Sequence, residues 1–207
     1  QFASALTDLR TSGLCDHSIL DMVRQRVYGI LADYEDQNDH DTLRSDPVFK
    51  LLADRLPEGA DLASQPTLSR FENAVTAADL LRLEAWFLEQ FILSFEQPPR
   101  TLTLDIDLFD DPTHGQQQLT FFHGYYDQSQ YEVRLITCAE NDQIAFPVLL
   151  HGTACARLGV MQDLGRVVRR LREAWPDVQI RWRGDCGFAA PAVYEGSEAL
   201  DIEYTLG

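Results

Sequence analysis

Two short segments about eighty residues apart each place an aspartate at the end of a predicted β-strand. The first segment is Leu102–Asp107, and the second is Ile180–Phe188, in which Asp185 follows a run of alternating apolar and basic residues. Carboxylate oxygens are hard ligands that suit Mg²⁺ or Mn²⁺. Two carboxylates at neighbouring strand ends are the core of a two-metal site, in which the ions stabilise the attacking and leaving oxygens of phosphoryl transfer. These residues therefore indicate metal-dependent phosphoryl transfer.

The same aspartates also have ordinary structural explanations. Asp105 and Asp107 share one face of their strand, and that face could simply be solvated. Asp185 stands beside two glycines and could be a turn residue. On the residues alone, the functional and the structural explanations carry about equal weight.

The elements around the two aspartates predict a mixed sheet. Apolar residues alternate in the strand-like runs and recur at helical spacing along one face between Val160 and Trp175. The predicted strands are 101–107, 119–126, 131–137, 144–150 and 178–183. The order of strand, hairpin, further strand, helix and strand suits a mixed α/β sheet in which the first and last strands lie side by side. Ribonuclease H-like folds have this order.

The first hundred residues are predicted to be helical. Ser18 with Asp21 and Thr76 with Asp79 are helix-start signals. The run 80–95 is apolar on most sides, which predicts a helix at the centre of an amino-terminal bundle. The Pro98–Pro99 pair breaks this run. The predicted class is therefore α/β (α+β), with a helical domain over 1–98, a candidate for binding DNA ends, and a sheet domain over 99–207.

Composition narrows the class of protein. The 207 residues are 45% hydrophobic, which is enough to bury a core. The sequence contains no run of eighteen consecutive apolar residues, so no transmembrane helix is predicted. The four cysteines show no CxxC spacing, so reduced thiols in a cytoplasmic protein are expected. The sequence begins at Gln1 and ends inside a predicted strand at Tyr204–Gly207, which is typical of a fragment.

The net charge of −16 argues against indiscriminate binding of nucleic acid, because phosphate affinity comes from Lys and Arg. A local basic surface is still possible. Arg166, Arg169 and Arg170 lie opposite the apolar stripe of their helix and could contact DNA phosphates. A solvated helix face with Glu173 and Asp163 as partners is the favoured alternative.

A second candidate for DNA contact is the segment Leu62–Val75. It could form the second half of a helix-turn-helix, with Arg70 facing bases or phosphates. A plain helical hairpin explains the same pattern equally well, and the acidity of this half of the chain weakens the DNA interpretation.

Other polar groups give weaker signals. His114, His123 and His151 each precede a glycine at spacings that match no zinc site, so turn or backbone-pairing roles are favoured. His114 and Gln116 follow the first strand closely enough to approach the metal site. The acidic run 36–41 lacks the spacing of an EF-hand and is expected to be a solvated loop or a helix cap.

Several long motifs occur in a recognisable order. They are Arg24–Gly29, Tyr34–Asp41, Leu62–Asn73, Asp105–Gln117, Phe121–Asp127 and Arg183–Phe188. In this order they resemble the DDE transposases of bacterial insertion sequences, in particular the group numbered thirteen-eighty. The resemblance covers nearly the whole chain. It implies a DNA transposase that cleaves transposon ends and joins them to target DNA, acting as a homo-oligomer on terminal repeats, in the cytoplasm and associated with the nucleoid.

The resemblance also implies a ribonuclease H-like catalytic domain in which three acids bind two Mg²⁺ or Mn²⁺ ions. The first acid carries over to Asp107 and the second to Asp185. Relatives tend to have Thr two residues after the first acid, whereas this chain has Phe109, so Asp105 is kept as the reserve ligand.

The third acid of the family is a Glu on a later helix. Glu195, Glu198 and Glu203 lie too close after Asp185 to be assigned to it. The third acid is therefore expected beyond Gly207, and the chain as it stands is expected to be inactive. Two alternatives remain open: a non-catalytic DNA-binding remnant of a transposase, and a related ribonuclease H-like nuclease without strand transfer.

Overall fold

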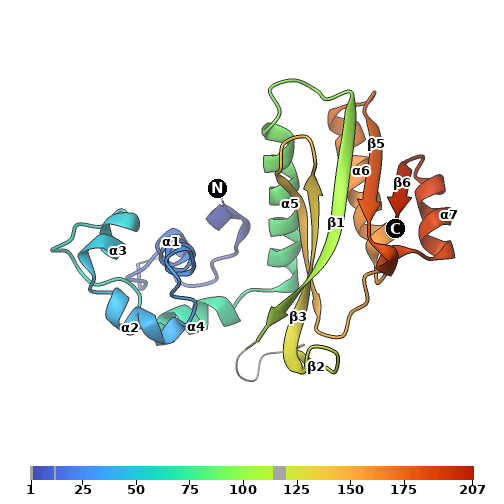
Figure 1. Ribbon diagram of the computed structural model, residues 1–207. Coiled ribbons are helices and arrows are strands. Elements are labelled where there is room, and N and C mark those ends of the chain that lie inside the picture. The colour runs from blue at the N-terminus through green and yellow to red at the C-terminus, as the bar shows by residue number, and fades with distance from the viewer. Residues whose placement is uncertain (1, 12, 114–119) are drawn as a thin grey trace. The chain divides into compact units, whose positions relative to one another are not determined.

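The computed structural model describes residues 2–11, 13–113 and 120–207, which fall into two compact units, Gln1–Leu83 and Glu84–Gly207 (Figure 1). The α-helices are α1 (Ile19–Leu31), α2 (His40–Leu43), α3 (Pro47–Leu52), α4 (Gln65–Asn73), α5 (Ala77–Leu93), α6 (Val160–Ala174) and α7 (Pro191–Ala199). The strands are β1 (Thr101–Pro112), β2 (Phe121–His123), β3 (Gln128–Cys138), β4 (Ile144–His151), β5 (Gln179–Gly184) and β6 (Glu203–Leu206). Three short 3₁₀ turns, η1 (Phe2–Ala5), η2 (Gln37–Asp39) and η3 (Cys186–Phe188), complete the described elements.

The carboxy-terminal unit is built on one mixed sheet. Its strands follow the order β2-β3-β1-β5-β6, and β4 also pairs with β3. β1 is antiparallel to β3 and parallel to β5, and β5 is parallel to β6. An antiparallel meander on one side of β1 and parallel strands reached through helices on the other side form a ribonuclease H-like arrangement. The predicted mixed α/β class, with the first strand beside the strand that precedes Asp185, is confirmed.

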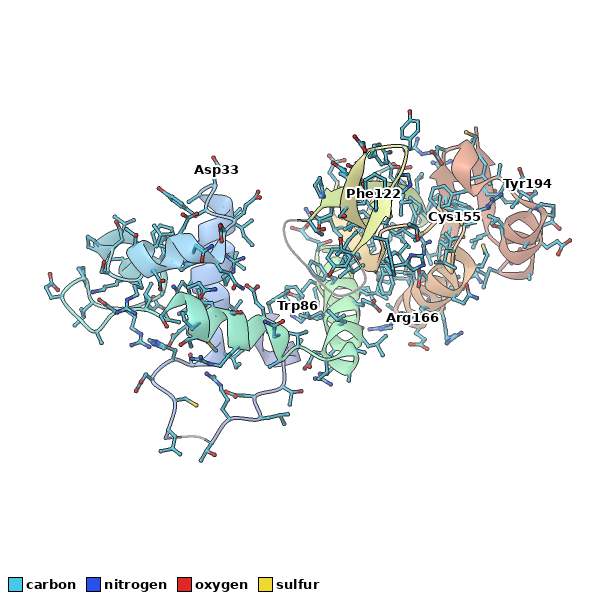
Figure 2. All side chains as sticks on the ribbon, turned by 90° about the horizontal axis from the view of Figure 1, so that it is seen from below. Asp33, Trp86, Phe122, Cys155, Arg166 and Tyr194 are labelled. Atoms are coloured by element: carbon cyan, nitrogen blue, oxygen red, sulfur yellow. The ribbon has the colours of Figure 1, made fainter. Side chains whose placement is uncertain are left out.

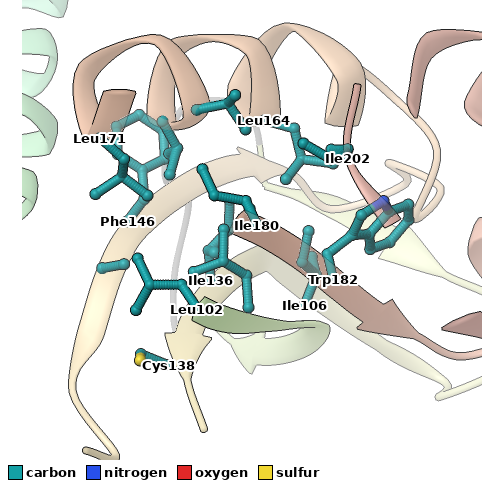
Figure 3. Packing of buried hydrophobic residues seen from close by; sticks show 14 of the residues in the cluster. Leu102, Ile106, Ile136, Cys138, Phe146, Leu164, Leu171, Ile180, Trp182 and Ile202 are labelled. Carbon is teal, nitrogen blue, oxygen red and sulfur yellow. The ribbon is translucent and has the colours of Figure 1, made fainter. Parts of the chain in front are cut away.

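One face of this sheet is buried because its strands alternate. Leu102, Leu104 and Ile106 on β1 are at most 3% exposed. The apolar stripe of α6 covers them, and Figure 3 shows Leu164 and Leu171 directed at the residues of the sheet. The opposite face of β1 and β5 carries Asp105, Asp107, Arg181 and Arg183, which are exposed or half-buried. We call this second surface the open face.

The helix that was predicted to lie at the centre of an amino-terminal bundle packs elsewhere. Leu88 and Phe91 of α5 are buried in the same core cluster as the sheet. Phe91 and Phe95 contact the ring of Trp175 edge-on, with ring centroids 6.5 and 5.2 Å away. The prediction was wrong because an apolar helix reveals that it is buried but not which partner buries it.

The amino-terminal unit is held by polar contacts at helix ends and by small cores. The predicted helix start at Ser18 and Asp21 is a complete capping box on α1. Asp36 caps η2, so the capping explanation of the acidic run is confirmed. His40 is fully buried, and its ring approaches α1 where Gly29 leaves room, since a Cβ there would lie 2.8 Å from the ring.

Asp79, at the start of α5, joins three segments of this unit. One carboxylate oxygen accepts hydrogen bonds from the amide and hydroxyl of Thr76, and the other accepts from the Thr7 amide, 2.8 Å away, and from Arg82. The Thr76 hydrogen bonds, followed by that of Thr7, hold the pKa of Asp79 well below its ordinary range. The folded state therefore favours the ionised carboxylate.

Asp79→Asn is expected to lower stability at about pH 7 and to lower it by a smaller amount at about pH 2. An unfolded Asp titrates near about 3.9, so the ionised carboxylate stabilises the folded state fully at pH values above that. The benefit decreases as the pH falls from there and is lost as the pH passes through the depressed folded-state pKa of Asp79. Urea unfolding followed by helical circular dichroism at both pH values measures this difference. Asp54→Asn, at an exposed surface ion pair with Arg24, is the control. A stability gap that is equal at both pH values would rule out this role for the Asp79 charge.

Candidate functional site

Asp107 and Asp185 lie at matching distances beyond the last paired residues of two adjacent parallel strands, β1 and β5. The last paired residues of β1 and β5 are Asp105 and Arg183, and each candidate acid lies two residues further along its own chain. Asp185 directly follows β5 and keeps an extended backbone, with φ −76° and ψ 178°. Neighbouring strands lie about 4.8 Å apart, and residues two apart share a face. The carboxylates of Asp107 and Asp185 therefore lie at the same end of the open face.

Each of these carboxylates has one oxygen bound by a nearby backbone amide. The Leu108 amide donates to Asp107 Oδ1 over 2.8 Å, and the Gly187 amide donates to Asp185 Oδ1 over 2.9 Å. A Cβ on Gly187 would lie 3.0 Å from the same oxygen, so glycine allows this close approach. Within the described residues, the second oxygen of each carboxylate accepts no hydrogen bond and remains available to a cation.

Asp105, the reserve ligand, is already occupied. Its carboxylate accepts two hydrogen bonds from Arg183, over 2.6 Å from Nε and 2.7 Å from Nη2. The carboxylate raises the pKa of Arg183 through these bonds. A cation would have to displace this pair before it could use Asp105, which favours Asp107 as the first acid.

Arg183 was not identified as a site residue from the sequence. Its alternation with Arg181 along β5 was the available signal, because the parallel register sets these two residues opposite Asp105 and Thr103. Arg181 Nε indeed donates to Thr103 Oγ1 over 2.7 Å. The ion pair between Arg183 and Asp105 thus connects β5 to β1 two residues before the candidate acids.

The described parts of the chain contain no group of three or more His, Cys, Asp or Glu side chains that could hold a metal ion. Glu195 and Glu198 lie on α7. Glu203 lies on β6, opposite Arg181 in the register of β5 and β6. His123 and His151 end β2 and β4, and His114 and Gln116 lie outside the described residues. The open face thus carries two candidate carboxylates, Asp107 and Asp185, each with one oxygen that accepts no hydrogen bond from a described residue.

Two of the three candidate arginines of α6 are engaged within their own unit. Arg166, which Figure 2 labels, pairs with Glu84 over 2.8 Å and lies over the ring of Phe146. Arg170 makes two hydrogen bonds to Glu89. The expected partners Glu173 and Asp163 were wrong, because helix α5 presents its own carboxylates to this side of α6. Arg169 is exposed and forms no ion pair with any described residue.

Arg70 lies exposed on α4, where its Nη2 donates to Thr67 Oγ1 over 3.1 Å. All four cysteines are free, and Cys138 is buried. No helix among the described residues is long and apolar enough to cross a membrane.

The sequence of the chain matches one known protein family over its whole length. The signature of the family described as "Transposase DDE domain group 1" matches residues 1–207. No curated protein sequence is significantly similar to this chain.

Several solved structures are similar at low identity. A piggyBac transposase synaptic complex with hairpin DNA has 11% identity and a TM-score of 0.44, over 99% of this chain and 47% of that one. A Mos1 transposase paired-end complex has 13% identity and a TM-score of 0.35, over 96% and 61%. A Drosophila P element transposase strand transfer complex has 10% identity and a TM-score of 0.34, over 86% and 40%. The chain thus spans about half to three fifths of the length of the first two of these proteins.

Proposed function

The chain belongs to the transposase DDE domain group 1 family, and from this premise we propose that it is the catalytic part of a DNA transposase that cleaves transposon ends and joins them to target DNA. Within the family, we propose the bacterial insertion-sequence group numbered thirteen-eighty. The observation that supports the proposal is the parallel register of β1 and β5, because Asp107 and Asp185 each follow its last pair, Asp105 and Arg183, by two residues.

In this proposal Asp107 and Asp185 hold divalent cations, with Mg²⁺ or Mn²⁺ as the ions and two as their number. The site is suited to them, because both carboxylates lie on one face and each keeps an oxygen free of described hydrogen-bond donors. When bound, the ions supply charge stabilisation to the attacking and leaving oxygens of phosphoryl transfer. The third acid of the family is assigned to no residue of this chain.

The chain's own groups orient these acids. The Leu108 and Gly187 amides each bind one oxygen of a carboxylate, which leaves the second oxygen for a cation. Arg183 holds Asp105 in an ion pair and adds a positive charge to the open face. A DNA phosphate would meet this positive charge on the same face.

We further assign the partners by function. Double-stranded DNA, both transposon ends and target, is the substrate, and the amino-terminal unit takes part in holding the ends. The working form on DNA is a homo-oligomer, since two ends must be joined in one reaction.

A strand-transfer assay tests the proposal. The product of the complete gene is mixed with Mn²⁺, a plasmid target and linear DNA that carries the sequences flanking the gene. The expected result is linear DNA joined to the plasmid, and the Asp107→Asn protein is the matched control. Cleaved but unjoined DNA would instead identify a nuclease, and intact DNA that is bound but uncleaved would identify a non-catalytic DNA-binding protein.

A further inference from the structure

Four arginines from separate parts of the amino-terminal unit line one cavity of about 640 Å³. Arg10 precedes α1, Arg44 follows α2, Arg55 follows α3, and Arg70 lies on α4. The unit has eight Lys and Arg against fourteen Asp and Glu, so half of its basic residues meet at this place. The volume falls within the range of small-molecule sites and has room for a nucleotide.

Arg44 and Arg70 have fewer contacts than the other two arginines. The carboxylate of Asp61 lies 3.3 Å from Arg44 Nη2 and is shared with Lys50 Nζ, 3.2 Å away. One negative charge therefore faces two positive charges. Arg70 is exposed, pairs with no described carboxylate, and uses one donor on the Thr67 hydroxyl.

The other two arginines, Arg10 and Arg55, each form an ion pair and a hydrogen bond to a backbone carbonyl. Arg55 Nη2 donates to Asp21 over 2.7 Å, and Nε and Nη1 carry no described hydrogen bond. Arg10 is fully engaged, because it binds both oxygens of Asp8 and the carbonyl of His17. Arg10 thus shapes the wall, while Arg44, Arg55 and Arg70 offer free N–H groups.

His17 also lines this cavity. Its Nδ1 is buried and has no hydrogen-bond partner in the described structure. A buried ring nitrogen without a partner costs free energy. The groups that the cavity offers to an anionic, oxygen-rich ligand are the guanidinium donors of its arginines.

We infer that this cavity binds a phosphate of the DNA sugar–phosphate backbone, with Arg44 and Arg70 as its main ligands. The inference rests on the proposed function for the identity of the strand. Guanidinium groups bind phosphate through paired N–H donors, and backbone contacts position a protein without reading sequence. The same chemistry would accept free phosphate or a nucleotide, so the test must separate these sources.

The test measures binding of a short fluorescein-labelled duplex of mixed sequence by fluorescence anisotropy, in EDTA and over a series of salt concentrations. The full chain is compared with Arg44→Gln/Arg70→Gln and with Arg24→Gln. Arg24 belongs to the same unit but pairs with Asp54 outside the cavity, so it controls for charge. The double variant is expected to bind at least about tenfold more weakly, with a salt slope reduced by about two, because two phosphate contacts are lost. Arg24→Gln is expected to remain within about twofold of wild type.

Three outcomes would overturn the inference. The first is equal weakening by both variants, which would mean that only overall charge matters. The second is unchanged binding in the double variant. The third is binding of sodium phosphate or a nucleotide at the cavity, seen by NMR, with no DNA binding by the wild type. Because the assay contains EDTA and reads no cleavage, each outcome leaves the metal site to be judged separately by Mn²⁺ binding.

Discussion

Asp107→Asn and Asp185→Asn are each expected to lower Mn²⁺ affinity by more than about a hundredfold, because even groups that only support a metal ligand typically contribute about 10–100-fold. The Asn side chain has a neutral amide oxygen, which cannot replace the negative charge of the carboxylate that the substitution removes. The measurement is Mn²⁺ titration followed by electron paramagnetic resonance, which needs no DNA and no knowledge of the transposon ends. Both residues are exposed or close to a turn, so the fold should survive the change.

Asp105→Asn is the matched control for this prediction. It removes an identical charge from the same face of the same strand, yet its carboxylate is engaged by Arg183. The affinity for Mn²⁺ should change by less than about tenfold, and stability by about 1 kcal/mol or less, as for other exposed ion pairs. If Asp105→Asn abolishes binding and Asp107→Asn does not, the first acid has been assigned to the wrong residue.

Phe109→Thr examines the departure from the family pattern. Phe109 is 48% exposed and shares the open face with Asp107, two residues before it. Because its ring makes no hydrogen bond to a carboxylate, the substitution should leave Mn²⁺ affinity within about threefold, well below the loss expected for a ligand. A large gain in affinity would instead show that Phe109 obstructs the site.

The sheet could be predicted because its strands alternate cleanly and their order restricts the pairing. The alternation of Leu102, Leu104 and Ile106 predicts a buried face, which the structure confirms. The order of the elements then leaves few possible positions in the sheet for the strand before Asp185. The partners of charged side chains could not be predicted in this way. Arg166 and Arg170 meet carboxylates of α5 that are about eighty residues earlier in the sequence.

The cavity in the amino-terminal unit could not be predicted from the sequence either. Arg10, Arg44, Arg55 and Arg70 are spread over sixty residues without a shared motif, and an acidic composition conceals them. Only the packing of short helices brings them together. Arg70 alone was singled out, through its place in a possible helix-turn-helix, and the structure adds neighbours that no local pattern relates to it.

Arg134 is the clearest case of a residue whose role depends on tertiary contacts. It lies on β3 between apolar neighbours and is completely buried, where the sequence predicts only a strand. Its guanidinium pairs with Asp163 in the first turn of α6 and donates to the carbonyls of Ala156 and Leu158. Its Nε is buried without a described partner. This residue therefore joins the sheet to α6 and to the loop before it.

Asp163→Asn is expected to destabilise the carboxy-terminal unit by about 3–5 kcal/mol, because it leaves a buried guanidinium without its counter-charge. All three tryptophans, Trp86, Trp175 and Trp182, lie in this unit, so urea unfolding followed by tryptophan fluorescence reports on it alone. Arg166→Gln is the control, since its partly exposed pair with Glu84 should contribute about 1 kcal/mol or less.

The double variant Arg134→Met/Asp163→Leu separates the cost of an unpaired charge from the loss of a useful contact. Replacing both members of a buried ion pair by apolar residues of similar size is often neutral or stabilising by about 1–4 kcal/mol. The double variant should therefore recover most of the stability that Asp163→Asn loses. If it is as unstable as the single variant, the carbonyls of Ala156 and Leu158 depend on the Arg134 donors, and that hydrogen bonding holds the loop before α6 in place.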